Sequence, residues 1–253
     1  MSRMIALGVL FGIVSGGCTS PTPTEAGSHG HWSYEGDTGP AHWGDLDSSY
    51  GLAKTGKSQS PINLVASITE TAPRLRFEYG ESAIHEVNNG HTIQENCDPG
   101  SAVRVGSERF ALRQFHFHSP SEHHLEGKGS PLECHLVHQN EAGDLLVIGI
   151  LFEVGEENPF LARVWSHIPA RPGEEVHVES VRLKIADLLP KSHTSYRYEG
   201  SLTTPPCTEN VRWIVFEETM PLSRKQLAHF RRFYHHNNRP LQPTNDRPVL
   251  KAN

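Results

Sequence analysis

A short run in which histidine and phenylalanine alternate, QFHFH beginning at Gln114, constrains the fold of this chain more than any other feature. Successive side chains of a β-strand point to opposite faces of the sheet. On a strand, Gln114, His116 and His118 therefore share one face, while Phe115 and Phe117 share the other. The phenylalanines can then enter a hydrophobic core while the polar trio faces a cavity. The run predicts a strand with two chemically different faces.

A second strand-like run, ECHLV beginning at Glu133, carries a third histidine. The same alternation places Glu133, His135 and Val137 on one face, so the three histidines converge if the two strands are neighbours. Three neutral imidazoles suit Zn²⁺ and leave a fourth tetrahedral position for water. Gln114 and Glu133 each lie two residues from a histidine on its own face, which predicts that they hold the second ring nitrogens of His116 and His135. Ordinary surface or core histidines remain the alternative from these local residues alone.

The rest of the chain favours a mostly β (α+β) domain. Runs rich in Val, Ile, Leu, Phe and Trp are separated by Gly, Pro and Asn, which is typical of strands and turns. Strands are predicted at residues 112–118, 132–138, 145–154, 176–183 and 211–217. Helical periodicity is confined to residues 157–168 and 223–235, the second with Ser223 as its N-cap. We therefore expect one β-dominated domain over residues 30–253.

The charge of the chain argues against nucleic-acid binding. Its formal net charge is −6 at pH 7, and its basic residues are scattered apart from a short cluster at Arg231 and Arg232. Such a chain offers no broad cationic surface to a phosphate backbone.

The first 29 residues are predicted to be a targeting segment and a linker. Arg3 precedes an apolar run at residues 5–14, which is too short to span a bilayer, and small residues follow at 15–17. We expect a signal peptide at residues 1–17 and a Pro/Thr/Ser/Gly-rich linker at 18–29. Cys18 is a candidate lipid acceptor, although Ser15 stands where lipoprotein signals carry a large aliphatic residue. Plain secretion and lipid anchoring at Cys18 both stay open, and both imply a periplasmic or extracellular protein.

The run QFHFHSPSEHHLEGKGSPLECHLVH resembles the zinc segment of the α-class carbonic anhydrases, especially the bacterial exported ones. Further blocks resemble the same family in the same order: GPAHWGDL, SQSPINL, VNNGHTIQ, GSLTTPPCTENVRWIVF and QPTNDRPV. The resemblance implies a large twisted, predominantly antiparallel sheet with short peripheral helices. It also implies reversible hydration of carbon dioxide to bicarbonate and a proton, by attack of a zinc hydroxide.

The resemblance assigns roles around the metal. His116, His118 and His135 are similar to the three zinc ligands. Thr203 is similar to the gatekeeper that accepts a hydrogen bond from the hydroxide, and Glu122 to the acceptor of the Thr203 hydroxyl. The remaining substrate-contacting residues implied by the family are Thr204, Val137, Val147 and Leu202, of which the last three form an apolar wall for CO₂.

The resemblance also implies a route for the proton. His91 is similar to the proton shuttle, a role that suits an imidazole with an unperturbed pKa of about 6.5. Tyr34, Asn89 and Gln94 resemble the residues that order water between the metal and the shuttle, although Gln94 stands where Asn is usual. A turn residue is the alternative for His91, and a solvated acid is the alternative for Glu122. The other nearby histidines are expected to be structural or exposed: His123, His124, His138, His235 and His236.

The family pattern breaks at one cysteine. Exported members often pair a cysteine before the QSPIN block with the cysteine of TPPC, but here Ala53 stands at the first position while Cys207 is present. We expect no such bridge, and Cys97 and Cys134 remain as alternative partners. The prolines Pro61 and Pro206 resemble family positions that follow cis peptide bonds.

Two other functions remain as alternatives. A binding module that has lost its zinc would lack at least one ligand histidine, and here all three are present. Ester hydrolysis is a plausible side activity of the same zinc hydroxide, but the chain has no G-x-S-x-G nucleophile motif. Bacterial members of the family are often dimers, so the resemblance also suggests that this protein forms a homodimer.

Overall fold

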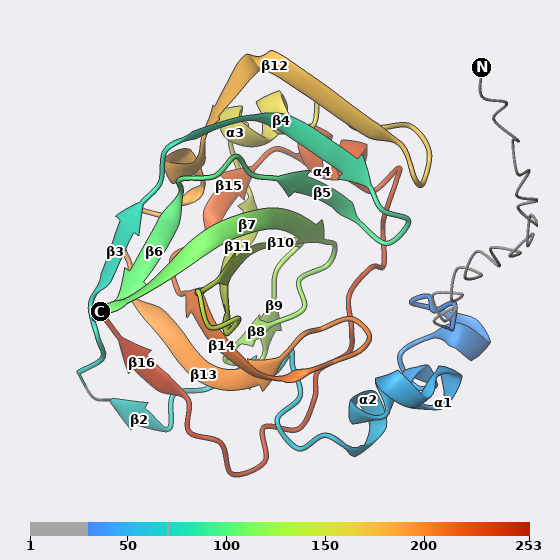
Figure 1. Ribbon diagram of the computed structural model, residues 1–253, viewed down its shortest axis with the longest axis vertical. Helices are drawn as coiled ribbons and strands as arrows, with labels where there is room; N and C mark the ends of the chain where they lie inside the picture. Colours follow the sequence, from blue (N-terminus) through green and yellow to red (C-terminus); the bar gives the residue numbers. More distant parts are fainter. Residues whose placement is uncertain (1–29, 70) are drawn as a thin grey trace, which may run out of the picture.

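The computed structural model describes residues 30–69 and 71–253, and a large sheet dominates it (Figure 1). Thirteen strands form this sheet, and its main path runs β12-β4-β5-β7-β10-β11-β14-β13-β16-β2. A second, three-stranded sheet has the order β1-β8-β9. The strands are β1 Asn63–Leu64, β2 Ile68–Thr69, β3 Leu75–Glu78, β4 Glu81–Asn88, β5 Ile93–Asn96, β6 Ala102–Val105, β7 Glu108–His118, β8 His124–Leu125, β9 Lys128–Gly129, β10 Leu132–Gln139, β11 Leu145–Val154, β12 Glu175–Lys184, β13 Ser195–Ser201, β14 Glu209–Phe216, β15 Met220–Leu222 and β16 Leu250–Ala252.

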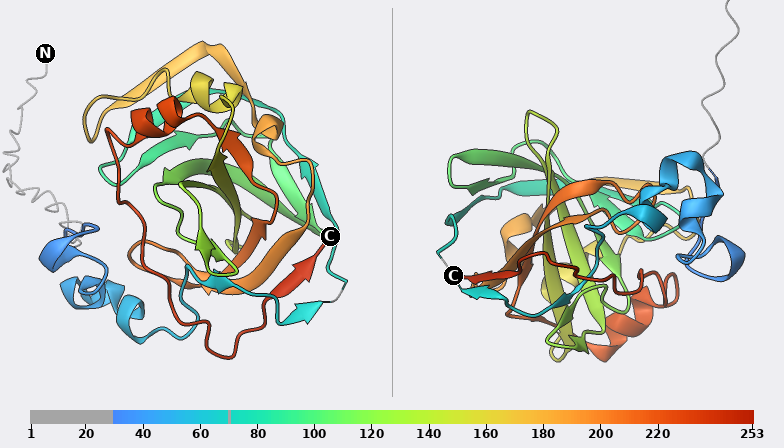
Figure 2. Two further views of the ribbon diagram at one scale, coloured as in Figure 1. Left: turned by 180° about the vertical axis from the view of Figure 1, so that it is seen from behind. Right: turned by 90° about the horizontal axis from the view of Figure 1, so that it is seen from below.

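The helices are short and lie around the outside of the sheet, as Figures 1 and 2 show. They are α1 Trp43–Leu46, α2 Leu52–Thr55, α3 Pro159–Val164 and α4 Arg224–Phe230, with 3-10 helices η1 Gly36–Thr38, η2 Ser48–Tyr50 and η3 Ile185–Leu188. In residues 30–69 and 71–253, no helix combines the length and apolarity needed to cross a bilayer. The predicted architecture, a large and predominantly antiparallel sheet with short peripheral helices, is confirmed.

The centre of the sheet is the strand trio β7, β10 and β11, which the sequence predicted. Strand β10 pairs antiparallel with both neighbours, and His135 lies opposite His116 on β7 and Gly149 on β11. Strand β11 in turn pairs parallel with β14. The predicted convergence of the two histidine runs therefore rests on direct strand pairing.

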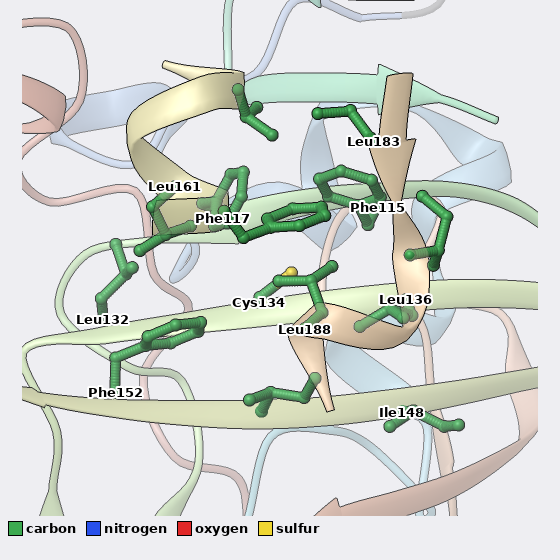
Figure 3. Close-up of a cluster of buried hydrophobic side chains, with 14 of the residues drawn as sticks. Phe115, Phe117, Leu132, Cys134, Leu136, Ile148, Phe152, Leu161, Leu183 and Leu188 are labelled. Carbon is green, nitrogen blue, oxygen red and sulfur yellow. The ribbon is translucent and has the colours of Figure 1, made fainter. Parts of the chain in front are cut away.

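One face of this trio carries the main hydrophobic core (Figure 3). Phe115 and Phe117 are fully buried there, beside Cys134 and Leu136 of β10. Helix α3 and the 3-10 helix η3 cover this layer, as Figure 3 shows. The phenylalanines thus lie in the core as predicted, and the alternation directs the histidines to the other face.

Both predicted helices are shorter than their periodicity suggested. Helix α4 begins after Ser223, whose hydroxyl accepts from the Gln226 amide while the Gln226 side chain accepts from the Ser223 amide, a capping box. It ends at Phe230, and in the turn that follows the amides of Phe233 and Tyr234 both donate to the Phe230 carbonyl. Helix α3 ends at Val164, so the outer residues of both predicted ranges lie outside the helices.

The three cysteines of the described chain are free thiols, with Cys134 and Cys207 buried. The peptide bonds before Pro61 and Pro206 are cis, as the family blocks implied, and so is the bond between Ser119 and Pro120, which the sequence analysis did not predict.

Candidate metal centre and active site

Three histidines meet on the face of the sheet opposite the main core. His116 and His118 extend from β7 and His135 extends from β10, and each offers one ring nitrogen within 4.8 Å of the others. The His118 and His135 side chains are buried, while His116 is half-buried. Burial lowers the pKa of all three imidazoles, for His118 to about 4. The rings are therefore neutral near pH 7, which is the form that binds a metal.

Two of the rings are oriented through Nδ1. His116 Nδ1 lies 2.8 Å from Gln114 Oε1, and His118 Nδ1 lies 2.6 Å from the Asn237 carbonyl oxygen. A carbonyl can only accept, so Nδ1 of His118 carries the proton and donates. The free atom is then His118 Nε2, which is buried and has no hydrogen-bond partner in the described chain.

The third ring is oriented by a buried carboxylate. His135 Nε2 lies 2.9 Å from Glu133 Oε1, which leaves Nδ1 free. His123 Nδ1 lies 2.8 Å from the same oxygen, and His123 Nε2 lies 2.7 Å from the Tyr198 hydroxyl. Although burial alone would raise the pKa of Glu133, His123 and His135 hold it well below its usual range. The packing leaves no spare room, because a Cβ at Gly149 would lie 2.9 Å from Glu133 Oε1.

These donors fit a zinc ion. Three imidazole nitrogens converge, and each ring has its second nitrogen held by a protein acceptor. One of the donors, His118 Nε2, is buried and has no partner among residues 30–69 and 71–253. Zinc-bound histidines usually have their second ring nitrogen held in this way, and a three-histidine set leaves one position open, as in catalytic zinc sites. When zinc is bound, it lowers the pKa of a water molecule at that position to about 7.

The buried carboxyl of Glu122 lies beside the rings of His118 and His135. Its Oε1 accepts from the Arg239 amide at 2.7 Å, and its Oε2 lies 3.9 Å from His135 Nδ1. Burial raises the pKa of Glu122 to about 7, against the lowering effects of His135, the Arg239 amide and the Thr203 hydroxyl. Thr203 is thus beside this carboxyl, although Glu122 Oε2 makes no hydrogen bond of ordinary geometry within the described residues. Thr204 follows on the same loop and is half-buried.

His91 lies on the turn between β4 and β5 and is half-buried. Its ring stacks on the indole of Trp32, with centroids 3.6 Å apart and an interplanar angle of 8°. Burial and the nearby His31 lower the pKa of His91. The turn is held by Asn89, whose Oδ1 accepts the amides of His91 and Thr92, each at 2.9 Å.

The residues expected to order water lie in two places. Gln94 is the cross-strand neighbour of His116, and its side chain lies 2.8 Å from Asn96 Oδ1 and 3.4 Å from Asn89 Nδ2. Tyr34 lies apart from this pair, with its ring edge-on to Trp32. Burial, and secondarily the charge of Glu122, raise the pKa of Tyr34, so it is a neutral hydroxyl near pH 7.

The apolar residues expected to form the substrate wall belong to one cluster. Val137 and Val147 are directly opposite each other on β10 and β11, and Leu202 packs against the same cluster. Val137 is on the same strand face as His135, because the two are two residues apart. Trp213 of β14 packs in this cluster and also approaches the His135 ring, at 4.8 Å between centroids.

Sequence reasoning missed four residues that support the site: Asn237, Arg239, Tyr198 and Trp32. Asn237 orients His118 through its backbone carbonyl and Arg239 holds Glu122 through its backbone amide, and neither atom is specific to a residue type. Tyr198 and Trp32 lie 75 and 59 positions from the histidines that they contact. His123, by contrast, was assigned a structural role and is buried between Glu133 and Tyr198. His138 is also structural, since its Nε2 lies 2.7 Å from the Tyr79 hydroxyl.

The fold and the site define a zinc enzyme whose three-histidine centre lies on a large antiparallel sheet. The model of eukaryotic-type carbonic anhydrases matches residues 38–253. A carbonic anhydrase of Pectobacterium carotovorum is 45% identical over 223 residues, which cover 87% of this chain and 90% of that protein. A carbonic anhydrase of Nostoc is 38% identical over 255 residues and covers 99% of this chain and 96% of its own length. Among solved structures, the α-carbonic anhydrase of Thermovibrio ammonificans, in complex with the inhibitor sulfanilamide, is 47% identical with a TM-score of 0.83, covering 88% of this chain and 99% of that one.

The chain therefore belongs to the eukaryotic-type, or α-class, carbonic anhydrase family. It is a zinc-dependent lyase that catalyses the reversible hydration of carbon dioxide to bicarbonate and a proton.

Proposed function

We propose that His116 Nε2, His118 Nε2 and His135 Nδ1 hold the catalytic zinc. The observation that carries this assignment is the buried Nε2 of His118, which has no partner in the described chain and lies among the other two free nitrogens. Gln114 and Glu133 keep the rings of His116 and His135 in the orientation that the metal needs. The Asn237 carbonyl does the same for His118.

Thr203 and Glu122 orient the attacking nucleophile. A hydroxyl has one proton, so a Thr203 that donates to Glu122 can only accept from the nucleophile. Glu122 is kept in place by the Arg239 amide, and the geometry of attack is thereby restricted, which is an orientation effect. Thr204 lines the position of bicarbonate. The apolar side chains of Val137, Val147 and Leu202 provide the wall against which CO₂ binds.

His91 carries the product proton from the site to solvent. Its ring is half-buried and lies on the turn between β4 and β5, so it borders both the protein interior and the solvent. Tyr34, Asn89 and Gln94 order the intervening water. A pKa below the usual value of about 6.5 leaves His91 unprotonated near neutral pH and therefore able to accept a proton.

The test is CO₂ hydration by stopped flow on zinc-loaded protein, on chelator-stripped protein and after zinc is restored. Fast hydration that disappears on stripping and returns with zinc supports the assigned centre. Replacement of His118 by Gln should abolish both zinc binding and hydration. Well-folded, zinc-bearing protein without hydration would favour a binding module instead. Turnover of an activated ester, measured in parallel, distinguishes esterase side activity from the main reaction.

We further propose that residues 1–17 direct export, so that the catalytic domain over residues 30–253 acts in the periplasm or outside the cell. Residues 1–29 lie outside the described residues, and the proposal rests on Arg3, the apolar run at residues 5–14 and the small residues before Cys18. Mass spectrometry of the mature N-terminus decides between a lipid-modified Cys18 and a plain cleaved end. Sedimentation of the zinc-loaded protein tests the homodimer that the family resemblance raises.

A further inference from the structure

A second group of metal-binding side chains lies outside the catalytic centre. Glu35, His235 and His236 each offer one ligand atom, and these atoms all lie within 4.8 Å of one another. None of the three belongs to the zinc site, and all three are exposed. The rings of His235 and His236 have centroids 4.9 Å apart. Two imidazoles and one carboxylate thus approach a common point on the surface.

The group lies in a small pocket that two distant segments build. The pocket has a volume of about 270 Å³ and is lined by residues 33–35 and 233–237. The three converging donors, two imidazoles and one carboxylate, are the feature of this pocket that favours a metal cation.

Both segments are held in place independently of any ligand. On one side, Ser33 Oγ donates to the Glu35 carbonyl at 2.7 Å and lies 2.8 Å from Thr38 Oγ1. On the other side, Asn237 follows His236 directly, and its Nδ2 donates to the carbonyls of His91 and Phe117 at 3.1 and 2.9 Å. A cation would therefore bind donors whose backbones are already fixed, so only their three exposed side chains would have to be ordered.

We propose that Glu35, His235 and His236 form a second metal site, which takes a late first-row divalent cation such as Zn²⁺. Imidazole and carboxylate are the ligands that this class of cation prefers, and three of them leave positions open for water. Hard cations such as Mg²⁺ and Ca²⁺ prefer oxygen ligands, and here two of three donors are nitrogens.

The location gives the second site a physical connection to the proton path. Trp32, which stacks on His91, lies three residues before Glu35. Asn237, next to His236, donates to the His91 carbonyl and accepts from His118. A cation at the second site would join the two segments that border the shuttle, so its occupancy restrains Trp32 and His91.

The experiment is calorimetric titration of Zn²⁺ into the full chain whose catalytic site is already loaded with zinc. We expect one further zinc per chain. Each of the variants Glu35→Gln, His235→Gln and His236→Gln removes one ligand. Each should weaken the affinity for this second zinc by about tenfold or more. The matched control is His42→Gln, which removes an exposed histidine that belongs to no metal-ligand group of the described chain. This control should bind the second zinc as the wild type does. Circular dichroism verifies that each variant is folded.

Two results would overturn the proposal. One is the absence of any second zinc in the wild-type titration. The other is a second zinc that survives in the His235→Gln/His236→Gln double variant. In that case His177→Gln tests another imidazole pair, in which the Nδ1 atoms of half-buried His85 and exposed His177 are 2.9 Å apart. If His177→Gln alone abolishes binding of the second zinc, the cation binds at His85 and His177.

Discussion

The indole of Trp32 and the imidazole of His91 lie face to face, with ring centroids 3.6 Å apart. The stack covers one side of the imidazole that we assign to proton transfer. Because covering an ionisable ring disfavours its charged form, Trp32 contributes to the burial that lowers the pKa of His91. The tryptophan thus influences both the position and the basicity of the His91 ring.

Replacing Trp32 by Leu should raise the pKa of His91 towards its usual value of about 6.5, since the ring becomes more exposed. Histidine chemical shifts in an NMR pH titration measure this directly. In weak buffer kcat should change while kcat/KM does not, because the hydration step does not involve His91. Trp32→Phe, which keeps an aromatic partner, is the control. An unchanged His91 pKa in Trp32→Leu would show that the stack has no electrostatic role.

Replacing Gln114 by Ala should weaken zinc binding by about 10- to 100-fold, because His116 loses the acceptor that orients its ring. Competition against a chelator of known affinity measures the change. Gln139→Ala, a substitution of a half-buried glutamine on neighbouring β10, is the matched control and should bind zinc normally. Equal affinity in the two variants would mean that the sheet alone positions His116.

Replacing Thr203 by Val should lower kcat/KM for CO₂ hydration by about 10²-fold, because the nucleophile loses an orienting acceptor in the transition state. Zinc affinity should be unchanged, since Thr203 is not a ligand. Thr208→Val, an exposed threonine on the same loop, serves as the control. Loss of zinc together with activity would instead indicate a structural role for Thr203.

Two buried carboxyls predict how stability depends on pH. Glu86 and Glu95 are cross-strand partners on β4 and β5, both fully buried, and neither Glu86 oxygen has a hydrogen-bond partner in the described chain. Burial raises the pKa of Glu86 to about 9 and that of Glu95 to about 8. For Glu86, the charge of Glu95 adds to this effect.

The folded protein therefore keeps protons that the unfolded chain, with ordinary values of 4.5, has already lost. When the native state binds more protons, the free energy of unfolding falls as pH rises, here between about pH 5 and 9. Glu86→Gln should flatten this decline and raise the free energy of unfolding at pH 8 by more than about 1 kcal/mol. Urea denaturation at several pH values measures the free energy of unfolding. The control is Glu81→Gln, which replaces an exposed residue on the same strand. A wild-type stability that does not fall over this range would contradict the prediction.

Much of the site follows from local pattern. The alternation around Phe115 and Phe117 predicted which side chains enter the core, and their positions are confirmed. The same phase places Gln114 beside His116 and Glu133 beside His135, because residues two apart on a strand share a face. The start of α4 after Ser223 was also predicted from the sequence, because the capping box lies within four consecutive residues.

The sequence by itself determined the faces of the strands and the types of donor that they carry. The tertiary structure alone decided which of these donors meet and what holds them. His118 is oriented by a carbonyl 119 residues away, Glu122 by an amide 117 residues away, and His91 is covered by Trp32, which precedes it by 59 residues. Contacts of this kind leave no local pattern, because a backbone carbonyl or amide is the same in every residue and its position depends on how the whole sheet closes.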